Sequence, residues 1–470
     1  MYCRSSFIIL ILFIAACTSV QTQITPQPFE TTDTPTLTLV ETPLQAEQTP
    51  ILELNPPLGN QIVFHNGTIL TMQDSQPQAR AILIQGDKIA DVGSDAQILA
   101  QAIPGALIID LQGRTIVPGF IDTHSHRIAW SLVGGDFDSP EAAIQAALEQ
   151  GWTGLHELDV NEQLYDTLRR LDERGQLRLR VAGYVGINSP VWDEPLGERL
   201  SDYEPTIYSP YLRIMGSKVF MNPSSEFYQD QEALNQLLPQ LHEDGWQIAI
   251  EAVESQTLEM VLNAFEQALQ GSHNRAYRHR IEHAVAISDE QVRRMAEMGL
   301  IASIQLNVPA SVMGEKQFPQ LVEQEPEGSV ARWRDLIEAG VPVVGNTDFP
   351  SIDMEAIDGP PPGSPLRLLY RGVTRTWGDG LPPEAWMLDQ AVTAEQALRL
   401  MTINAAYASF EEEMRGSLAA GKLADLVVLS ANPLTIPPEE LRNLEVLMTM
   451  VGGTTEWCQP GNEGLCPSWP

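Results

Sequence analysis

Two histidines at the end of an apolar run carry the clearest chemistry in this sequence. His124 and His126 follow the segment Val117 to Ile121, which is typical of a buried strand. Side chains two residues apart on an extended strand point to the same side, so the two imidazoles converge. Imidazole nitrogens are favoured ligands of divalent cations such as Zn²⁺. The spacing therefore indicates a metal site at a strand end, although a bare His-x-His pattern also arises without one.

The elements around this pair alternate in type. From Thr115 onward, short apolar runs alternate with amphipathic stretches, which is the pattern of βα units. Helices are expected over 140–150 and 289–298, the second capped by Ser288. Eight strands separated by helices predict an α/β protein with a (β/α)8 barrel over 116–408, whose active site lies at the C-terminal strand ends. The expected strands span 116–122, 152–157, 178–185, 212–219, 246–251, 279–283, 300–305 and 341–346.

Both ends of the folded region have a different, β-rich character. Residues 61–70 and 81–92 each read as strand, turn and strand, around Asn66-Gly67 and Gly86-Asp87. After a helix expected over 394–408, β character returns at 416–418 and 425–429. We expect residues 58–115 and 409–457 to form one composite β-sandwich from the two ends of the chain.

The composition limits the partners. The 470 residues include 62 acidic and 28 basic side chains, a formal net charge of −34. Such a balance opposes binding to a polyanion, so we expect no nucleic-acid partner. A small-molecule substrate is expected instead, and nothing in the sequence indicates an oligomeric state.

The first residues have the features of a bacterial export signal. Arg4 precedes an apolar run over 7–16 that is too short to span a bilayer. The run ends in Ala15-Ala16-Cys17, which resembles the lipobox of bacterial lipoproteins, whose cysteine receives lipid; a plain secretory signal is the alternative. We expect residues 1–17 to be a signal peptide and 18–57, rich in Thr, Pro and Gln, a disordered tether. The protein would then be extracytoplasmic and anchored to a bacterial membrane through lipidated Cys17.

Two further cysteines lie near the end of the chain. Cys458 and Cys466 flank a short Gly- and Pro-containing loop in the tail 458–470. In an oxidising compartment we expect them to form a disulfide, with two free thiols as the alternative.

Five segments, in this order along the chain, resemble motifs of the amidohydrolase superfamily. They are most similar to the branch that includes N-substituted formamide deformylases, and the resemblance covers most of 60–455. The long insertion that the family usually has between strands one and two is nearly absent here. The segments are 117–126 (VPGFIDTHSH), 151–157 (GWTGLHE), 278–284 (RHRIEHA), 345–350 (GNTDFP) and 416–429, which contains GKLADLVVL.

The resemblance implies roles for individual residues. His124, His126 and His283 would bind metal, and Asp348 would bind metal and accept the proton of the attacking water. His156 would contact substrate or hydrogen-bond to a ligand, with Glu157 orienting it. The other histidines and the aromatic side chains are expected to be structural or at the surface: His65, His242, His273, His279, Trp130 and Tyr184.

Lys218 and Glu251 leave two interpretations open. Many relatives with two metals carbamylate a strand-four lysine with CO₂, and Lys218 stands at that position, but Glu251 replaces the usual strand-five histidine. In one interpretation, carbamylated Lys218, Glu251 and His283 hold a second metal, since carboxylates also bind zinc. In the other, protonated Lys218 pairs with Glu251, because a buried carboxylate needs a counter-charge. One metal would then remain, and a degenerate site that binds little metal is a third possibility.

The resemblance implies hydrolysis of a non-peptide C–N bond in an amide, N-acyl or cyclic amide, by water that one or two divalent ions, expected to be zinc, activate. A deaminase or an esterase of the same superfamily would use a similar site. A non-catalytic lipoprotein that binds a small molecule is the alternative from another class, and the unusual Glu251 favours it.

Overall fold

The computed structural model describes residues 60–135, 137–188, 203–221, 230–271, 275–307, 324–326, 328–350, 359–376 and 385–468. The expected signal peptide, Cys17 and the expected tether lie outside these residues. Within the described part of the chain, no helix is long and apolar enough to cross a membrane.

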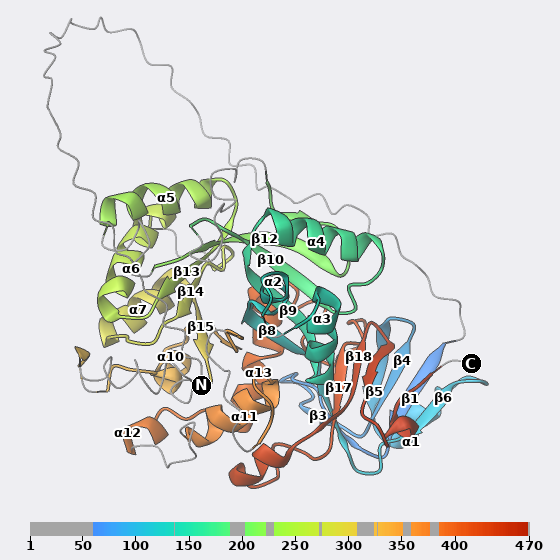
Figure 1. Cartoon of the computed structure of the whole chain (residues 1–470). Coiled ribbons are helices and arrows are strands. Elements are labelled where there is room, and N and C mark those ends of the chain that lie inside the picture. Colours follow the sequence, from blue (N-terminus) through green and yellow to red (C-terminus); the bar gives the residue numbers. More distant parts are fainter. Residues whose placement is uncertain are drawn as a thin grey trace, which may run out of the picture. The chain divides into compact units, whose positions relative to one another are not determined.

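Eight parallel strands form a nearly closed barrel (Figure 1). The last strand lies beside the first, where the peptide of Ser125 bridges to that of Phe349. The prediction of an α/β fold with eight parallel strands is therefore confirmed. Runs of buried residues identify such strands, because helices cover the outside of the barrel and side chains fill its inside. The strands are β8 (Phe120–Ser125), β9 (Trp152–Val160), β10 (Arg180–Gly186), β12 (Leu212–Val219), β13 (Gln247–Ala252), β14 (Arg280–His283), β15 (Ile301–Gln305) and β16 (Val343–Asn346), with short β11 (Thr206–Ile207) antiparallel to β12.

Helices follow the strands and pack around the barrel (Figure 1). Helix α7 has the bounds that the sequence predicts and begins with a capping box between Ser288 and Gln291. It ends at Gly299, whose φ of 68° is left-handed and favours glycine. The helices of this region are α2 (Arg127–Leu132), α3 (Pro140–Glu149), α4 (Glu162–Glu173), α5 (Gln231–Glu243), α6 (Ser255–Leu269), α7 (Asp289–Met298), α10 (Trp333–Glu338), α11 (Pro365–Thr374), α12 (Ala385–Leu388), α13 (Ala394–Leu400) and α14 (Ile403–Ala408).

Two further sheets contain the strands outside the barrel. One has the order β5-β4-β1-β6 and the other β19-β18-β17-β7-β2-β3, so the second joins strands from both ends of the chain. Phe64 and Ile82 of the first sheet share a hydrophobic cluster with Ile116 and Val428 of the second. The strands are β1 (Gln61–His65), β2 (Thr68–Leu70), β3 (Gln78–Ala79), β4 (Ala81–Gln85), β5 (Lys88–Gly93), β6 (Leu107–Asp110), β7 (Thr115–Pro118), β17 (Leu426–Leu429), β18 (Val446–Val451) and β19 (Thr454–Cys458), and helix α1 spans Asp95–Leu99.

Four local expectations were wrong. Residues 416–418, expected to have β character, belong to no strand. The strand expected over 116–122 is two strands of different sheets, β7 and β8, separated at Gly119, where a Cβ atom would lie 2.3 Å from the Thr153 side chain. The strands on either side of Asn66-Gly67 belong to different sheets, so this turn does not close a hairpin. The helix expected over 394–408 divides into α13 and α14 at Met401 and Thr402.

Buried polar contacts join the barrel to the six-stranded sheet. The guanidinium of Arg180 in β10 donates to both carboxylate oxygens of Asp425, at 2.7 and 2.9 Å. Asp425 also accepts the backbone N–H of Gly452 at 2.8 Å. These contacts tie the segment that precedes β17 to the barrel wall.

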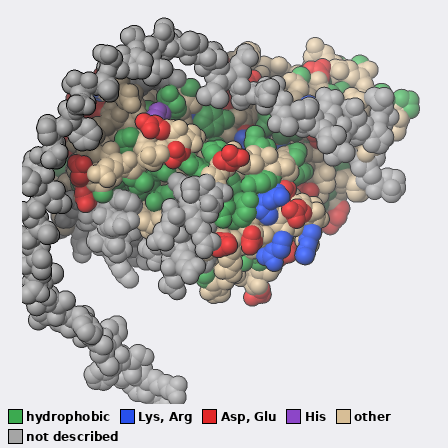
Figure 2. All heavy atoms as spheres, turned by 90° about the horizontal axis from the view of Figure 1, so that it is seen from above, with side chains coloured by type: hydrophobic (Ala, Val, Ile, Leu, Met, Phe, Trp, Pro, Cys, Tyr) green, Lys and Arg blue, Asp and Glu red, His purple; other side chains and the backbone are tan. Residues whose placement is uncertain are grey.

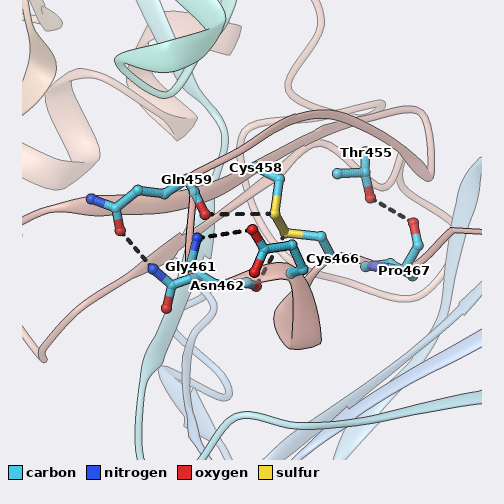
Figure 3. The surroundings of a disulfide bond; sticks show 8 residues. Thr455, Cys458, Gln459, Gly461, Asn462, Cys466 and Pro467 are labelled. Atoms are coloured by element: carbon cyan, nitrogen blue, oxygen red, sulfur yellow. Dashed lines mark hydrogen bonds between the residues drawn. A yellow bond between two sulfur atoms is a disulfide. The ribbon is translucent and has the colours of Figure 1, made fainter.

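A disulfide joins Cys458, at the end of β19, to Cys466, which directly follows a short 3₁₀ helix (Glu463–Leu465). Figure 3 shows this loop, in which Thr455 Oγ1 also donates to the carbonyl oxygen of Pro467 at 3.0 Å. Acidic side chains are scattered over the face seen in Figure 2, as the net charge requires.

Candidate metal centre

The seam of the barrel brings three potential metal ligands together. His124 in β8, His126 directly after it and Asp348 after β16 each place a ligand atom within 4.8 Å of the others. Oδ1 of Asp348 lies 3.4 Å from Nε2 of His124 and 3.5 Å from Nε2 of His126. The backbone N–H of Asp348 donates to the carbonyl oxygen of His124 at 2.9 Å, which fixes the two strand ends against each other.

This donor set suits a divalent cation. Two imidazole nitrogens and one carboxylate oxygen are a common ligand set of catalytic zinc sites, which leave a further position open for water. Burial lowers the pKa of His126 to about 3, and the pKa of His124 also lies well below its ordinary value because the ring is buried. Both imidazoles are therefore neutral near pH 7, as metal binding requires.

Glu282 holds the ring of His124. Its Oε2 lies 2.8 Å from Nδ1 of His124, which makes Nδ1 the protonated nitrogen and leaves Nε2 with a lone pair that can serve as a metal ligand. Glu282 is fully buried, and Arg280 neutralises its charge through a hydrogen bond of 2.5 Å from Nε.

Arg280 in turn is fully buried in the middle of the barrel. Besides Glu282, its guanidinium donates to the carbonyl oxygen of Thr123 and to Oγ of Ser303 at 2.5 and 2.9 Å. It also contacts Nδ1 of His156 at 3.1 Å and the hydroxyl of Tyr184 at 3.2 Å. A saturated guanidinium of this kind fixes the position of the Glu282 carboxylate.

A second group of residues lies beside His124 and consists of Lys218, Glu251 and His283. Nζ of Lys218 is 3.3 Å from Oε1 of Glu251 and 3.3 Å from Nε2 of His124. Nε2 of His283 is 3.6 Å from the same oxygen of Glu251, and its Nδ1 is 4.0 Å from Oδ2 of Asp348. The structure thus gathers all six residues that the sequence assigned to metal binding. Three of them, His124, His126 and Asp348, converge tightly enough to hold one ion.

Electrostatics at this site follow from burial and close charges. Burial alone would raise the pKa of Glu251, but the Lys218 ammonium and His283 together lower it below its ordinary value. Burial raises the pKa of Asp348 to about 7, despite the positive charges of His283 and Lys218 nearby. A carboxyl group with this pKa can both take up and release a proton near neutral pH.

The backbone is strained at two of these residues. His283 has a φ of 75° and Asp348 a φ of 49°, both in the left-handed region that non-glycine residues rarely adopt. Such strain costs free energy and is concentrated at functional sites, where the surrounding structure maintains it.

His156 lies one layer below the ligands. It is fully buried, its ring stacks on Tyr184, and its Nδ1 contacts Arg280, whereas its Nε2 has no hydrogen-bond partner among the described residues. Direct contact of His156 with substrate stays a prediction. Glu157 does not orient His156, as we had expected: its carboxylate accepts the backbone N–H groups of Ile128 and Ala129 at 3.0 and 3.2 Å. It therefore fixes the helix that follows His126.

The remaining candidates have structural surroundings. His242 and His279 contact each other at 3.0 Å, and Tyr184 is fully buried and donates to Gln247; His273 lies outside the described residues. Sequence reasoning assigned no role to Arg280 and Glu282. The sequence nevertheless indicates their pairing. Two charged residues at alternate positions of an otherwise buried strand lie on the same face, and each needs an opposite charge beside it.

A family model described as "Amidohydrolase family" matches residues 136–455. The N-substituted formamide deformylase of Arthrobacter pascens is 24% identical over 556 aligned residues, which cover 85% of this chain and 99% of that protein. An imidazolonepropionase of Acinetobacter baumannii is 24% identical over 408 residues, covering 78% of this chain and 92% of that protein.

Solved structures share the fold. An uncharacterized metal-dependent hydrolase from Pyrococcus horikoshii superposes with a TM-score of 0.65 at 18% identity, covering 81% of this chain and 99% of that one. A Xaa-Pro dipeptidase with bound methionine superposes with a TM-score of 0.58 at 18% identity, covering 85% of this chain and 100% of that one.

Proposed function

Because the chain belongs to the amidohydrolase family, we propose that it is a metal-dependent hydrolase of carbon–nitrogen bonds other than peptide bonds. Its substrate would be an amide, an N-acyl compound or a cyclic amide. The observation that carries this proposal is the convergence of His124, His126 and Asp348 at the seam of the barrel. The names of the formamide deformylase and the imidazolonepropionase among the relatives support the choice of bond.

The residues of the site have distinct tasks in this proposal. His124, His126 and Asp348 would hold a divalent ion, for which zinc is our first candidate. Such an ion lowers the pKa of a bound water to about 7 and polarises a carbonyl oxygen. Asp348 would accept the proton of the attacking water at its carboxylate and deliver it to the leaving nitrogen. Glu282 keeps Nε2 of His124 unprotonated and pointed at the ion.

Lys218 and Glu251 determine the number of ions. If Lys218 is carbamylated by CO₂, its carboxylate, Glu251 and His283 would hold a second ion beside the first. If Lys218 remains an ammonium, it neutralises Glu251 at 3.3 Å and one ion binds. Either arrangement gives the buried Glu251 carboxylate a positive partner, which it requires.

Metal analysis of the purified protein, followed by assay of the metal-loaded enzyme on a panel of amides, tests the proposal. Two equivalents of bound metal would support the carbamate and one the ion pair. Near-zero metal after reconstitution, with no turnover on any amide, would favour a small-molecule-binding lipoprotein and reject the proposal. Turnover restricted to esters or amidines would instead indicate an esterase or a deaminase.

We also propose a domain organisation for the chain. The barrel over 116–408 would be the catalytic domain, and 58–115 with 409–457 would form a β-sandwich; the shared hydrophobic cluster of the two sheets supports this. Lipidated Cys17 and the tether 18–57 would hold the enzyme at the outside of a bacterial membrane.

A further inference from the structure

A cavity opens at the end of the barrel opposite the metal centre. Its volume is about 350 Å³, and the structure describes every residue that lines it. These residues come from β11, from the first residues of β12 and β13, and from the segments before β13, before β14 and after helix α14. Parallel strands begin at one mouth of a barrel and end at the other, where the metal centre lies. We call this hollow the basal cavity; its size and mainly apolar lining are typical of small-molecule sites.

Large apolar side chains are exposed on the walls of the basal cavity. Ile207 of β11, Tyr277 and Phe410 are 69, 38 and 44% exposed, and all three line it. A single exposed side chain of this kind is ordinary, but several gathered at one hollow are typical of a binding site. Removing apolar surface from water is favourable in proportion to its area. A ligand that fills the cavity would therefore gain free energy by covering these three side chains.

Phe410 is held at the cavity at a conformational cost. Its φ of 59° lies in the left-handed region that bulky residues rarely adopt, yet nearly half of its surface, 44%, stays exposed. The guanidinium of Arg278 lies 4.5 Å from the centre of its ring, and Glu412 fixes that guanidinium through two hydrogen bonds. A strained residue that presents a fixed aromatic ring to solvent is expected where the ring contacts a ligand.

Two hydrogen bonds determine where the protons of His242 and His279 lie. The backbone N–H of Ile248 donates to Nδ1 of His279 at 3.0 Å, so this nitrogen carries no proton. The proton of the neutral ring is then on Nε2, which donates to Nδ1 of His242 at 3.0 Å. The proton of His242 must therefore lie on its Nε2. Burial lowers the pKa of both rings, that of His279 to about 3, which keeps them neutral near pH 7.

The Nε2–H group of His242 is a donor that the described residues do not use. His242 lines the basal cavity, and the one hydrogen bond that its ring forms within the described part of the chain uses Nδ1. The arginine of the lining is already neutralised, because Arg213 pairs with Glu411 at 2.9 Å and donates to the carbonyl oxygen of Ser409 at 3.0 Å. A ligand that matches these groups is neutral and accepts a hydrogen bond from His242.

We propose that the basal cavity is a second ligand site, for a neutral aromatic heterocycle that carries a hydrogen-bond acceptor. The rings of Tyr277 and Phe410 offer the contacts that favour a flat aromatic partner. Nε2–H of His242 requires the acceptor on that partner. The ligand is bound here and not hydrolysed, so this inference goes beyond the proposed function and does not rest on it.

Quinoline and naphthalene test this proposal, because they have the same shape and only quinoline has an acceptor, its ring nitrogen. Saturation-transfer NMR titrations of the purified protein near pH 7 measure the binding of both. Two variants change the cavity: His242→Phe removes the donor and keeps a ring, and Phe410→Gly removes a ring and suits the left-handed backbone. The matched control is His65→Phe, since His65 lies in β1 of the four-stranded sheet and does not line the cavity. Thermal midpoints show whether each variant is folded.

We expect both compounds to bind the wild type. His242→Phe should weaken the binding of quinoline about fivefold, the usual effect of one neutral hydrogen bond, and should not weaken that of naphthalene. Phe410→Gly should weaken the binding of both compounds, because both lose the aromatic wall. His65→Phe should weaken the binding of neither.

Three results would overturn the proposal. Neither compound might bind the wild type, or His242→Phe might weaken both compounds equally, which would mean that no hydrogen bond from His242 is involved. The third result is binding that neither His242→Phe nor Phe410→Gly weakens, which would place the compounds elsewhere, such as at the metal centre. None of these measurements requires turnover, so failure of this site would leave the proposed function standing, and an inactive enzyme would leave this site standing.

Discussion

In the proposed function, Asp348 combines two roles in one carboxylate. It offers an oxygen to the same point as His124 and His126, and burial raises its pKa to about 7. In Asp348→Asn the side chain keeps its size but can neither accept the proton nor bind metal through a charged oxygen. We expect kcat/KM to fall by at least about 10²–10⁴, the usual contribution of a general acid–base.

The fold of this variant should persist, because the contact of residue 348 with His124 uses the backbone N–H. Circular dichroism and steady-state assays of the metal-loaded variant check both expectations. Activity within tenfold of the wild type would contradict the assignment of Asp348.

In the proposed metal centre, Glu282 would affect metal binding through His124 and not by direct contact. In Glu282→Gln the charge that orients Nδ1 of His124 is lost and Arg280 becomes an unpaired buried cation. We expect the affinity for Zn²⁺ to fall about 10–100-fold, as is typical when a partner of a ligating histidine is replaced. Competition with a chromophoric chelator measures the Zn²⁺ affinity independently of turnover.

The matched control for this experiment is Glu412→Gln. Glu412 also pairs with an arginine, accepting two hydrogen bonds from Arg278 at 2.6 and 2.9 Å. Within the described part of the chain, its side chain forms no hydrogen bond or ion pair with the metal-site residues. Its metal affinity should equal that of the wild type. The same loss in both variants would mean that general destabilisation, and not the orientation of His124, explains the result.

The cluster of His124, His126 and Asp348 could be predicted from the sequence, because each of these residues lies in a compact motif at a strand end. The pairing of Arg280 with Glu282 within β14 could be inferred from their alternate positions. Their further contacts, with Thr123, His124 and His156, could not, because those residues lie on other strands that only the closed barrel brings together.

Among the elements, the segment preceding β17 depends on one ion pair. Arg180 and Asp425 are almost fully buried, and their two hydrogen bonds join the barrel to the six-stranded sheet. Replacing one partner of a buried pair leaves the other charge uncompensated, which typically costs about 3–5 kcal/mol. We therefore expect Asp425→Asn to lower the free energy of unfolding by about that amount in urea titrations near pH 7.

The Arg180–Asp425 pair should also make the free energy of unfolding depend on pH. Burial raises the pKa of Asp425, but Arg180 outweighs burial and holds the pKa below its ordinary value of 3.8. A carboxylate with a lowered pKa stabilises the fold above its unfolded-state pKa and loses this contribution as the pH falls through the folded-state value. The difference between wild type and Asp425→Asn should therefore shrink when the pH is taken from 7 to well below 3.8. An equal difference at both pH values would exclude this ionic contribution.

The positions of the barrel strands could be predicted because both of their faces are buried, which gives continuous apolar runs. The strand prediction failed where the local sequence resembled a different arrangement of strands. The chain from 116 to 122 reads as one strand, yet at Gly119 it passes from the six-stranded sheet into the barrel. The turn at Asn66-Gly67 has the residues of a hairpin, but which sheet each flanking strand joins depends on distant partners.

At the scale of the whole molecule, the proposed anchor makes the location of the enzyme testable. Each buried CH₂ of an acyl chain contributes about 0.8 kcal/mol, so several chains on Cys17 would hold the protein firmly at a membrane. We expect Cys17→Ala to prevent labelling with radioactive palmitate and to change the migration of the processed protein. Cys3→Ala is the control, since Cys3 would leave with the signal peptide and labelling should persist. Palmitate incorporation into Cys17→Ala would contradict lipidation at this residue.

The closure of the barrel at its seam has a consequence for how the protein is made. His124 and His126 come from the first strand and Asp348 follows the last, and the backbone bond between Asp348 and His124 forms only when those strands meet. A nascent chain carries both histidines long before the third ligand has been synthesised. Tight uptake of metal therefore has to wait until the ribosome has finished the barrel and, if the chain is exported unfolded, until it has crossed the membrane. The metal that the enzyme carries would then be the one available in the compartment where folding ends.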